Sequence, residues 1–114
     1  MMKSPALALL VLFTSHAAGA ADIVGAWRIH GSVFFNAVDT VCHFKGDGPG
    51  VAATCENGKP SAFTPVTVAG GEVAWNWDAG PAVLVFQGAL TSDTTIKGEI
   101  KVRGFTGSFT ATKQ

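Results

Sequence analysis

Helical periodicity is absent from the sequence between Asp22 and Gln114. Apolar side chains alternate there with polar ones in short runs, and glycine-rich turns separate the runs. Strict alternation is typical of a β-strand with one buried face, whereas an amphipathic helix repeats with a period near 3.6 residues. The missing helical period excludes helical bundles and α/β folds, and we expect an all-β chain.

Long apolar runs are also missing. A membrane-spanning helix needs about 20 consecutive apolar residues, but the apolar run from Ala6 to Phe13 ends in three polar side chains. An early cation at Lys3 and the small residues Ala18-Gly19-Ala20 complete the layout of a secretory signal peptide. We therefore expect residues 1–20 to be a signal peptide and residues 21–114 to be one domain, periplasmic or extracellular.

The chain has no excess of charge of either sign. Removing Lys3 with the expected signal peptide leaves 7 basic against 8 acidic residues, a net charge of −1. Binding to nucleic acid or to an anionic membrane surface usually needs a basic excess. The charge balance therefore predicts no nucleic-acid partner.

Cysteine is scarce, with only Cys42 and Cys55 in the whole chain. Export implies an oxidising compartment, in which two cysteines are expected to pair. A disulfide closing a loop of this length stabilises the fold by about 3 kcal/mol, which matters because a domain of roughly 100 residues buries only about 60 to 65% of its unfolded surface. The alternative is two free thiols packed as small apolar groups.

The alternating runs define eight candidate strands, each rich in β-branched or aromatic residues and bounded by turn residues. Most of the turns contain glycine, which supplies the positive φ that tight hairpins require. We place the first turn at His30-Gly31. The expected strands are 22–29, 33–45, 50–56, 61–69, 72–77, 82–90, 95–103 and 104–112.

Hairpin pairing tests these strands, because a slip of one residue would turn every side chain to the other face. Folding each hairpin about its turn keeps one face apolar throughout. It also sets Cys42 opposite Cys55, although neither cysteine was used to choose the register. The expected pairs are Trp27 with Phe34, Cys42 with Cys55, Val66 with Trp75, Trp75 with Phe86, Phe86 with Ile100, and Ile100 with Gly107. The pattern predicts an eight-stranded antiparallel up-and-down (meander) barrel with one disulfide.

The two faces of the predicted sheet differ in character. Gly25, Gly88, Gly98 and Gly107 fall on the inner, apolar face, where glycines let strands of a closed sheet bend sharply. Charged side chains of the strand 95–103 fall on the outer face. A membrane pore shows the reverse arrangement, so we expect no membrane insertion after cleavage.

An opening strand with Gly25-Ala26-Trp27, an eight-strand meander and an apolar interior resemble the lipocalin and avidin-like (calycin-type) small barrels. The tail, from Gly98-Glu99-Ile100 to Thr112, resembles small exported bacterial barrels of unestablished role. The resemblance implies a barrel with a small ligand in its lumen. Two departures are plain: no arginine lies on the last strand to cover Trp27, and the chain has no tyrosine for avidin-like biotin binding.

The predicted lumen carries large rings and few polar groups. An eight-stranded barrel is either just filled by its side chains or holds one small ligand, and both alternatives stay open. A ligand in the lumen would contact side chains on the inner face of the predicted strands. The candidate residues are Trp27, Phe34, Asn36, Thr64, Trp75, Trp77 and Phe86.

No catalytic constellation is recognisable. Catalysis needs a nucleophile or general base within reach of a partner that orients it. His30 falls in a turn, and His43 falls on the outer face with Glu56 as its nearest acid. We expect no enzyme, no metal site and no cofactor.

A set of apolar side chains falls on the outer face of the expected strands. Single exposed apolar residues are ordinary, whereas a contiguous patch suggests a protein partner or a homo-oligomer. The set is Val33, Phe35, Val41, Phe63, Val83 and Val85. Two functions therefore compete: a binding protein that holds a small apolar ligand in the lumen, or an interaction module with a packed core, such as a protease inhibitor or an envelope-assembly factor.

Overall fold

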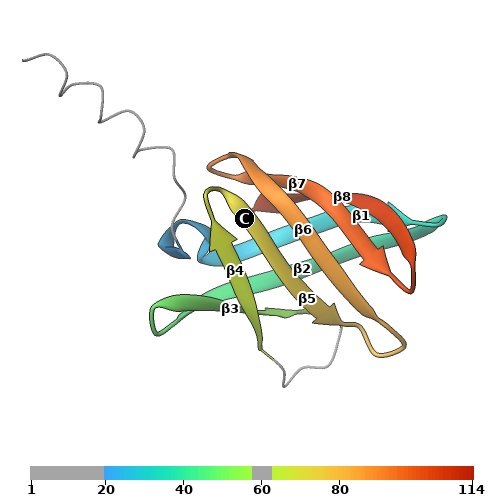
Figure 1. Ribbon diagram of the computed structural model, residues 1–114, viewed down its shortest axis with the longest axis horizontal. Helices are drawn as coiled ribbons and strands as arrows, with labels where there is room; N and C mark the ends of the chain where they lie inside the picture. The colour runs from blue at the N-terminus through green and yellow to red at the C-terminus, as the bar shows by residue number, and fades with distance from the viewer. Residues whose placement is uncertain (1–19, 58–62) are drawn as a thin grey trace, which may run out of the picture.

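The computed structural model describes residues 20–57 and 63–114. In these residues a short 3₁₀ helix, η1 (Ala20–Ile23), precedes eight strands that close into an antiparallel meander barrel (Figure 1). The strands are β1 (Gly25–Val33), β2 (Asn36–Asp47), β3 (Gly50–Cys55), β4 (Thr64–Ala69), β5 (Glu72–Asp78), β6 (Val83–Ser92), β7 (Thr95–Val102) and β8 (Phe105–Lys113). The predicted all-β, eight-stranded meander barrel is confirmed.

The N-terminal prediction is not tested, because the expected signal peptide lies outside the described residues except for Ala20. Within the described part of the chain, no helix has the length and apolar character needed to span a membrane.

Most of the predicted register is confirmed. β2 and β3 pair Cys42 with Cys55, and β5 and β6 pair Trp75 with Phe86. On the following strands Phe86 pairs with Ile100, and Ile100 pairs with Gly107. The apolar face therefore runs around the inside of the barrel as the alternation predicted.

The first hairpin differs from the prediction. β1 continues through His30-Gly31 and turns at residues 34–35, so that Trp27 pairs with Cys42 and not with Phe34. The reason is barrel closure: β1 also pairs with β8 from Trp27 to Ser32, and a strand ending at residue 29 would leave the part of this seam from His30 to Ser32 unpaired. Val33, predicted to face outward, is consequently buried and only 4% exposed.

One end of the barrel is closed by η1 (Figure 1). The indole Nε1 of Trp27 donates a hydrogen bond to the carbonyl of Ile23 at 2.9 Å. The ammonium group of Lys113, on the last strand, donates to the carbonyl of Asp22 at 3.1 Å and lies 5.8 Å from the centre of the Trp27 ring. Lys113 thus covers Trp27, at the place where the resemblance to lipocalins implies an arginine.

The opposite end is formed by the turns at 34–35, 79–82 and 103–104, which Figure 1 shows at the end away from η1. In an antiparallel meander alternate turns lie at the same end, and the turns at 48–49, 70–71 and 93–94 therefore lie beside η1. The two ends are built differently: η1 covers one, and the hairpin turns at 34–35, 79–82 and 103–104 stand at the other.

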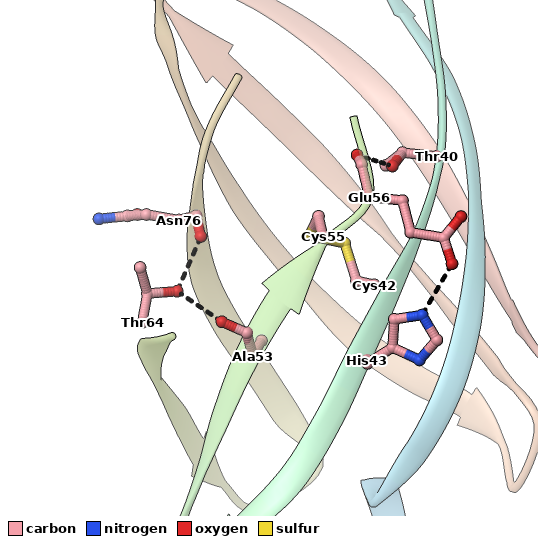
Figure 2. The surroundings of a disulfide bond; sticks show 8 residues. All are labelled: Thr40, Cys42, His43, Ala53, Cys55, Glu56, Thr64 and Asn76. Atoms are coloured by element: carbon pink, nitrogen blue, oxygen red, sulfur yellow. Dashed lines mark hydrogen bonds and ion pairs between the residues drawn. A yellow bond between two sulfur atoms is a disulfide. The ribbon is translucent and has the colours of Figure 1, made fainter. Parts of the chain in front are cut away.

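The end of β3 is fastened to β2 around the Cys42–Cys55 disulfide (Figure 2). The Thr40 hydroxyl donates to the carbonyl of Glu56 at 2.7 Å, and the Glu56 carboxylate lies 2.8 Å from Nε2 of His43. A disulfide is typical of proteins in an oxidising, exported environment. The predicted disulfide is confirmed, and so is the proximity of His43 to Glu56.

The seam between β3 and β4 is short, with three paired positions. Thr64, at the start of β4, donates its hydroxyl to the carbonyl of Asn76 on β5 at 2.9 Å and lies 3.4 Å from the carbonyl of Ala53 on β3 (Figure 2). This side chain therefore ties three strands together at the seam.

Inward glycines let neighbouring strands approach closely. A Cβ atom added to Gly98 would overlap the carbonyl oxygen of Gln87, and one added to Gly107 would overlap that of Ser32. Gly31 faces the Ser108 carbonyl in the same way. These overlaps are with backbone, which cannot rotate aside, so glycine is required at these positions by strand packing.

A pair of alanine substitutions tests this requirement. Gly98→Ala is expected to destabilise the fold by about 1–3 kcal/mol or more, as overpacking does. Gly46→Ala is the control, because an added Cβ there meets nothing within 4 Å, and its effect should stay within about 1 kcal/mol. Urea unfolding measures both, and equal midpoints for the two variants would contradict the close strand approach.

Candidate functional site

The half of the barrel nearest η1 is filled by aromatic rings. Trp27, Phe44, Trp75, Phe86 and Phe109 form a ring column whose members are at most 4% exposed. Neighbouring ring centroids lie 6.4, 4.9, 4.8 and 5.2 Å apart along this order. Such spacing is that of ring–ring packing in protein cores. The interior here is a packed core.

The other half opens into a cavity of about 630 Å³, which we call the mouth. This volume is within the range of small-molecule sites, roughly 300–1,000 Å³. Its wall is mainly apolar, with Val38, Trp77 and Leu84 among its residues. The full lining is Val33, Phe34, Asn36, Ala37, Val38, Asp39, Trp77, Ala79, Pro81, Ala82, Leu84, Val102, Arg103 and Phe105.

Aromatic side chains stand on the rim of the mouth. The rings of Phe34 and Phe105 are stacked with centroids 4.5 Å apart, and Phe35 lies 5.6 Å from Phe34. Phe34 and Phe35 are 62% and 96% exposed. Phe34 was predicted to point into the lumen, and this was wrong because it lies in the turn and not on a strand.

The backbone of the 34–35 turn is unusual. Phe34 and Phe35 have φ angles of 47° and 68°, in the left-handed region that bulky side chains rarely adopt. Two-residue hairpin turns of this kind favour Asn-Gly or Asp-Gly, so Phe34-Phe35 carries no recognisable turn signal. Left-handed backbone at non-glycine residues gathers at ligand and switch sites, which makes this tip a candidate functional feature.

Three polar side chains line the mouth, and each has a partner. Asp39 lies 3.1 Å from the Arg28 guanidinium and 3.5 Å from Nδ1 of His30. The amide of Asn36 donates to the Phe34 carbonyl at 3.2 Å, within the turn. The guanidinium of Arg103 donates to the carbonyl of Pro81 and so links two of the turns around the mouth.

Two indole N–H groups lack a hydrogen-bond acceptor. Nε1 of Trp75 and Nε1 of Trp77 are both buried without a partner among the described residues. Leaving such a donor unpaired costs about 1–3 kcal/mol. Because both nitrogens are buried, neither is available as a donor in the mouth. The polar groups that the mouth presents are those of Asn36, Asp39 and Arg103.

The residues selected from the sequence divide between three places. Trp27, Trp75 and Phe86 belong to the ring column. Phe34, Asn36 and Trp77 line the mouth, although Asn36 is exposed in its strand and does not face the core. Thr64 sits at the β3–β4 seam and is not a lining residue of the mouth.

The selection missed several residues of the mouth. Val38, Leu84 and Val102 were expected to face inward but were not singled out, although they are the inward residues closest to the turns at one end. Their place on the inner face beside these turns was the sequence signal that could have identified them as lining residues. Arg103 carried no signal, because its contact with Pro81 depends on two turns that are 22 residues apart in sequence.

The outer apolar set does not gather into one surface. Val33 faces the interior, and Val41 and Val85 are half-buried. Phe35, Phe63 and Val83 are exposed, and the ring of Phe63 lies 4.8 Å from the Lys45 ammonium. What remains of the predicted partner surface is the tip at Phe35, together with separate residues on β6 and before β4.

Two other features lie on the outside of the barrel. A hollow of about 490 Å³ lies over the outside of β4 to β7 and is lined mainly by small or polar residues such as Ala74, Gln87 and Lys97. Within residues 20–57 and 63–114, no group of three or more His, Cys, Asp or Glu side chains is placed to hold a metal. The His43–Glu56 pair stands by itself on the outer face.

Comparison with known proteins supports the barrel fold. No protein-family model and no curated protein matches the chain. Among solved structures, EF1p2_mFAP2b bound to DFHBI is similar, with a TM-score of 0.62, 16% identity, and coverage of 84% of this chain and 97% of that chain. A redesigned β-barrel is similar with a TM-score of 0.52, 11% identity, and coverage of 86% and 96%. At these identities the similarity shows a small β-barrel fold.

The division between ring column and mouth can be tested with two phenylalanines. Phe86→Ala should destabilise the fold by about 3–5 kcal/mol, because it opens a cavity in the ring column. Phe105→Ala should cost less than about 1 kcal/mol, because that ring is 47% exposed on the rim. Chemical unfolding of both variants provides the measurement. Similar losses in the two would mean that the interior is not divided in this way.

Proposed function

We propose that this protein is a non-catalytic binding protein that holds a small apolar molecule in the mouth of its barrel. The observation that carries the proposal is the apolar cavity of about 630 Å³ at the end opposite η1. Burial of apolar ligand surface provides the affinity, at roughly 25 cal/mol per Å² before the entropic costs of binding are subtracted.

The comparison adds support of a coarser kind. The similar barrel EF1p2_mFAP2b is bound to DFHBI, so a barrel of this size has room for a small molecule. In the present chain the ligand would sit among Val38, Trp77 and Leu84 and beneath the stacked rings of Phe34 and Phe105. Its site is therefore at the mouth and not deep in the lumen.

Binding of a neutral apolar dye tests the proposal. N-phenyl-1-naphthylamine, which fluoresces more strongly in apolar surroundings, should bind saturably to the wild type. Val38→Trp should weaken binding by about tenfold or more, because an indole at this lining position fills the cavity. Fluorescence titration measures the affinity, and DFHBI serves as a second probe.

The matched control is Val41→Trp. Val41 is on the same strand, half-buried on the outer face, and is not a lining residue of the mouth. It should leave the dye affinity unchanged. A dye that fails to bind the wild type, or that binds both tryptophan variants as well as the wild type, would refute a site in the mouth.

A second candidate function, an interaction module, is favoured by one observation. The ring of Phe35 is 96% exposed at a hairpin tip whose backbone is left-handed at both positions. A rigid, exposed aromatic tip is the type of anchor that inserts into a protein partner. The partner would be either a second copy of the chain or another exported protein.

Self-association through the tip has a direct test. If the tip joins two copies, the wild type should be larger than a monomer by size-exclusion chromatography with light scattering, and Phe35→Asp should be monomeric. Aspartate tolerates the left-handed backbone at this position better than most residues, so the fold should be retained. A monomeric wild type at high protein concentration would remove the oligomer.

A further inference from the structure

We propose that the ligand of the mouth is an anionic amphiphile, an apolar body carrying one carboxylate, and that Arg103 binds the carboxylate. This inference rests on the proposed function and names the class of molecule that the mouth takes. The apolar wall accounts for the body of the ligand. The charge of the rim accounts for its head group.

The backbone conformation of Arg103 and one hydrogen bond restrict where its side chain lies. It is the first residue of the turn at 103–104, with a φ of 50° in the left-handed region. Most residues avoid this backbone, which favours glycine or asparagine. The guanidinium reaches across the rim to the Pro81 carbonyl, between the turns 79–82 and 103–104. It is thus held at the edge of an apolar cavity.

The guanidinium retains most of its binding capacity. An arginine side chain has five N–H donors, and the contact of Arg103 with Pro81 uses its Nη2 group on a neutral carbonyl. In the part of the chain that the structure describes, no ion pair neutralises Arg103. Guanidinium groups bind carboxylates through two parallel hydrogen bonds, and the remaining donors suit this geometry.

The acidic groups nearest the mouth are already engaged. Asp39, which also lines the cavity, contacts Arg28 and His30. Asp78 accepts a hydrogen bond from the backbone N–H of Gly80 within its own turn. Among the lining residues of the mouth that the structure describes, Arg103 is therefore the one charged side chain without an ion-pair partner.

The body of the ligand would lie against the apolar wall. Val38, Leu84 and Val102 supply contacts that discriminate little between an alkyl chain and a ring. Each methylene that is buried there should raise the affinity about fourfold. A carboxylate at the rim then fixes which end of the molecule remains outside, which apolar contacts alone cannot do.

The test compares decanoate with decanol, which share an alkyl chain and differ in charge. Each is titrated against bound N-phenyl-1-naphthylamine, and the ratio of the two dissociation constants is taken for each protein. The ratio for the wild type should favour decanoate more than the ratio for Arg103→Asn does. The substitution should reduce the preference for decanoate about tenfold. Asparagine accepts the left-handed backbone, so the turn is retained. Taking the ratio cancels any effect of the substitution on the shape of the cavity.

The matched control is Lys101→Gln, which removes one positive charge from the outer face of β7, the strand that precedes the turn of Arg103. It should leave the ratio unchanged. Arg103→Lys should retain part of the preference, because it keeps the charge and loses the paired hydrogen bonds. Arg103→Gly, which also fits the left-handed backbone, replaces Arg103→Asn if the latter does not fold.

The possible results separate the inference from the function on which it rests. If decanol and decanoate both displace the dye and the ratio is the same in wild type and Arg103→Asn, the role of Arg103 is overturned and the apolar site stands. If neither compound displaces the dye and the dye itself does not bind, the proposed function fails. An equal loss of preference in Lys101→Gln would mean that the net charge matters and Arg103 itself does not.

Discussion

Closure of the sheet between β1 and β8 is the constraint on which the rest of the structure depends. The seam requires β1 to extend to Ser32, and it requires backbone to approach backbone where Gly31 and Gly107 lack a side chain. The length of β1 then places the first turn at residues 34–35 and brings Phe34 to the rim. The shape of the mouth is thus a result of how the barrel closes at a seam on its side.

The interior is divided into the ring column and the mouth because most of the large buried rings pack together in the column. The ring column packs against η1, whose contacts with Trp27 and Lys113 seal that end. Toward the other end, aliphatic side chains such as Val38, Leu84 and Val102 line a cavity together with Trp77. The tightest ring packing is therefore in one half, and the apolar cavity is in the other.

The period of two residues allowed much of this fold to be predicted. Alternation assigned most side chains to the correct face, and the pairing of Cys42 with Cys55 followed from it. The first hairpin could not be predicted in the same way, because its true partner for Trp27 lies eight positions further along the partner strand. An even shift leaves the side chains of both strands on their predicted faces, apart from Val33 and Phe34 beside the turn, so periodicity does not detect it.

The candidate site was less accessible to sequence reasoning. Whether rings fill a barrel depends on how they stack, as Trp75 and Phe86 do at 4.8 Å, and a residue pattern does not contain this information. The contact of Arg103 with Pro81 joins two turns that are not neighbours in the chain. Sequence could therefore identify the inward residues but could not separate those of the core from those of the cavity.

The arrangement of the turns has a consequence for how such a protein can change over time. The three tips at 34–35, 79–82 and 103–104 belong to different strand pairs and surround the mouth, while the ring column lies deeper in the barrel. Substitutions in a tip can alter the size and charge of the opening with little effect on the packing that maintains the fold. In a chain built in this way, the opening of the cavity can change by mutation of a few rim residues, without a prior gain of stability elsewhere to compensate.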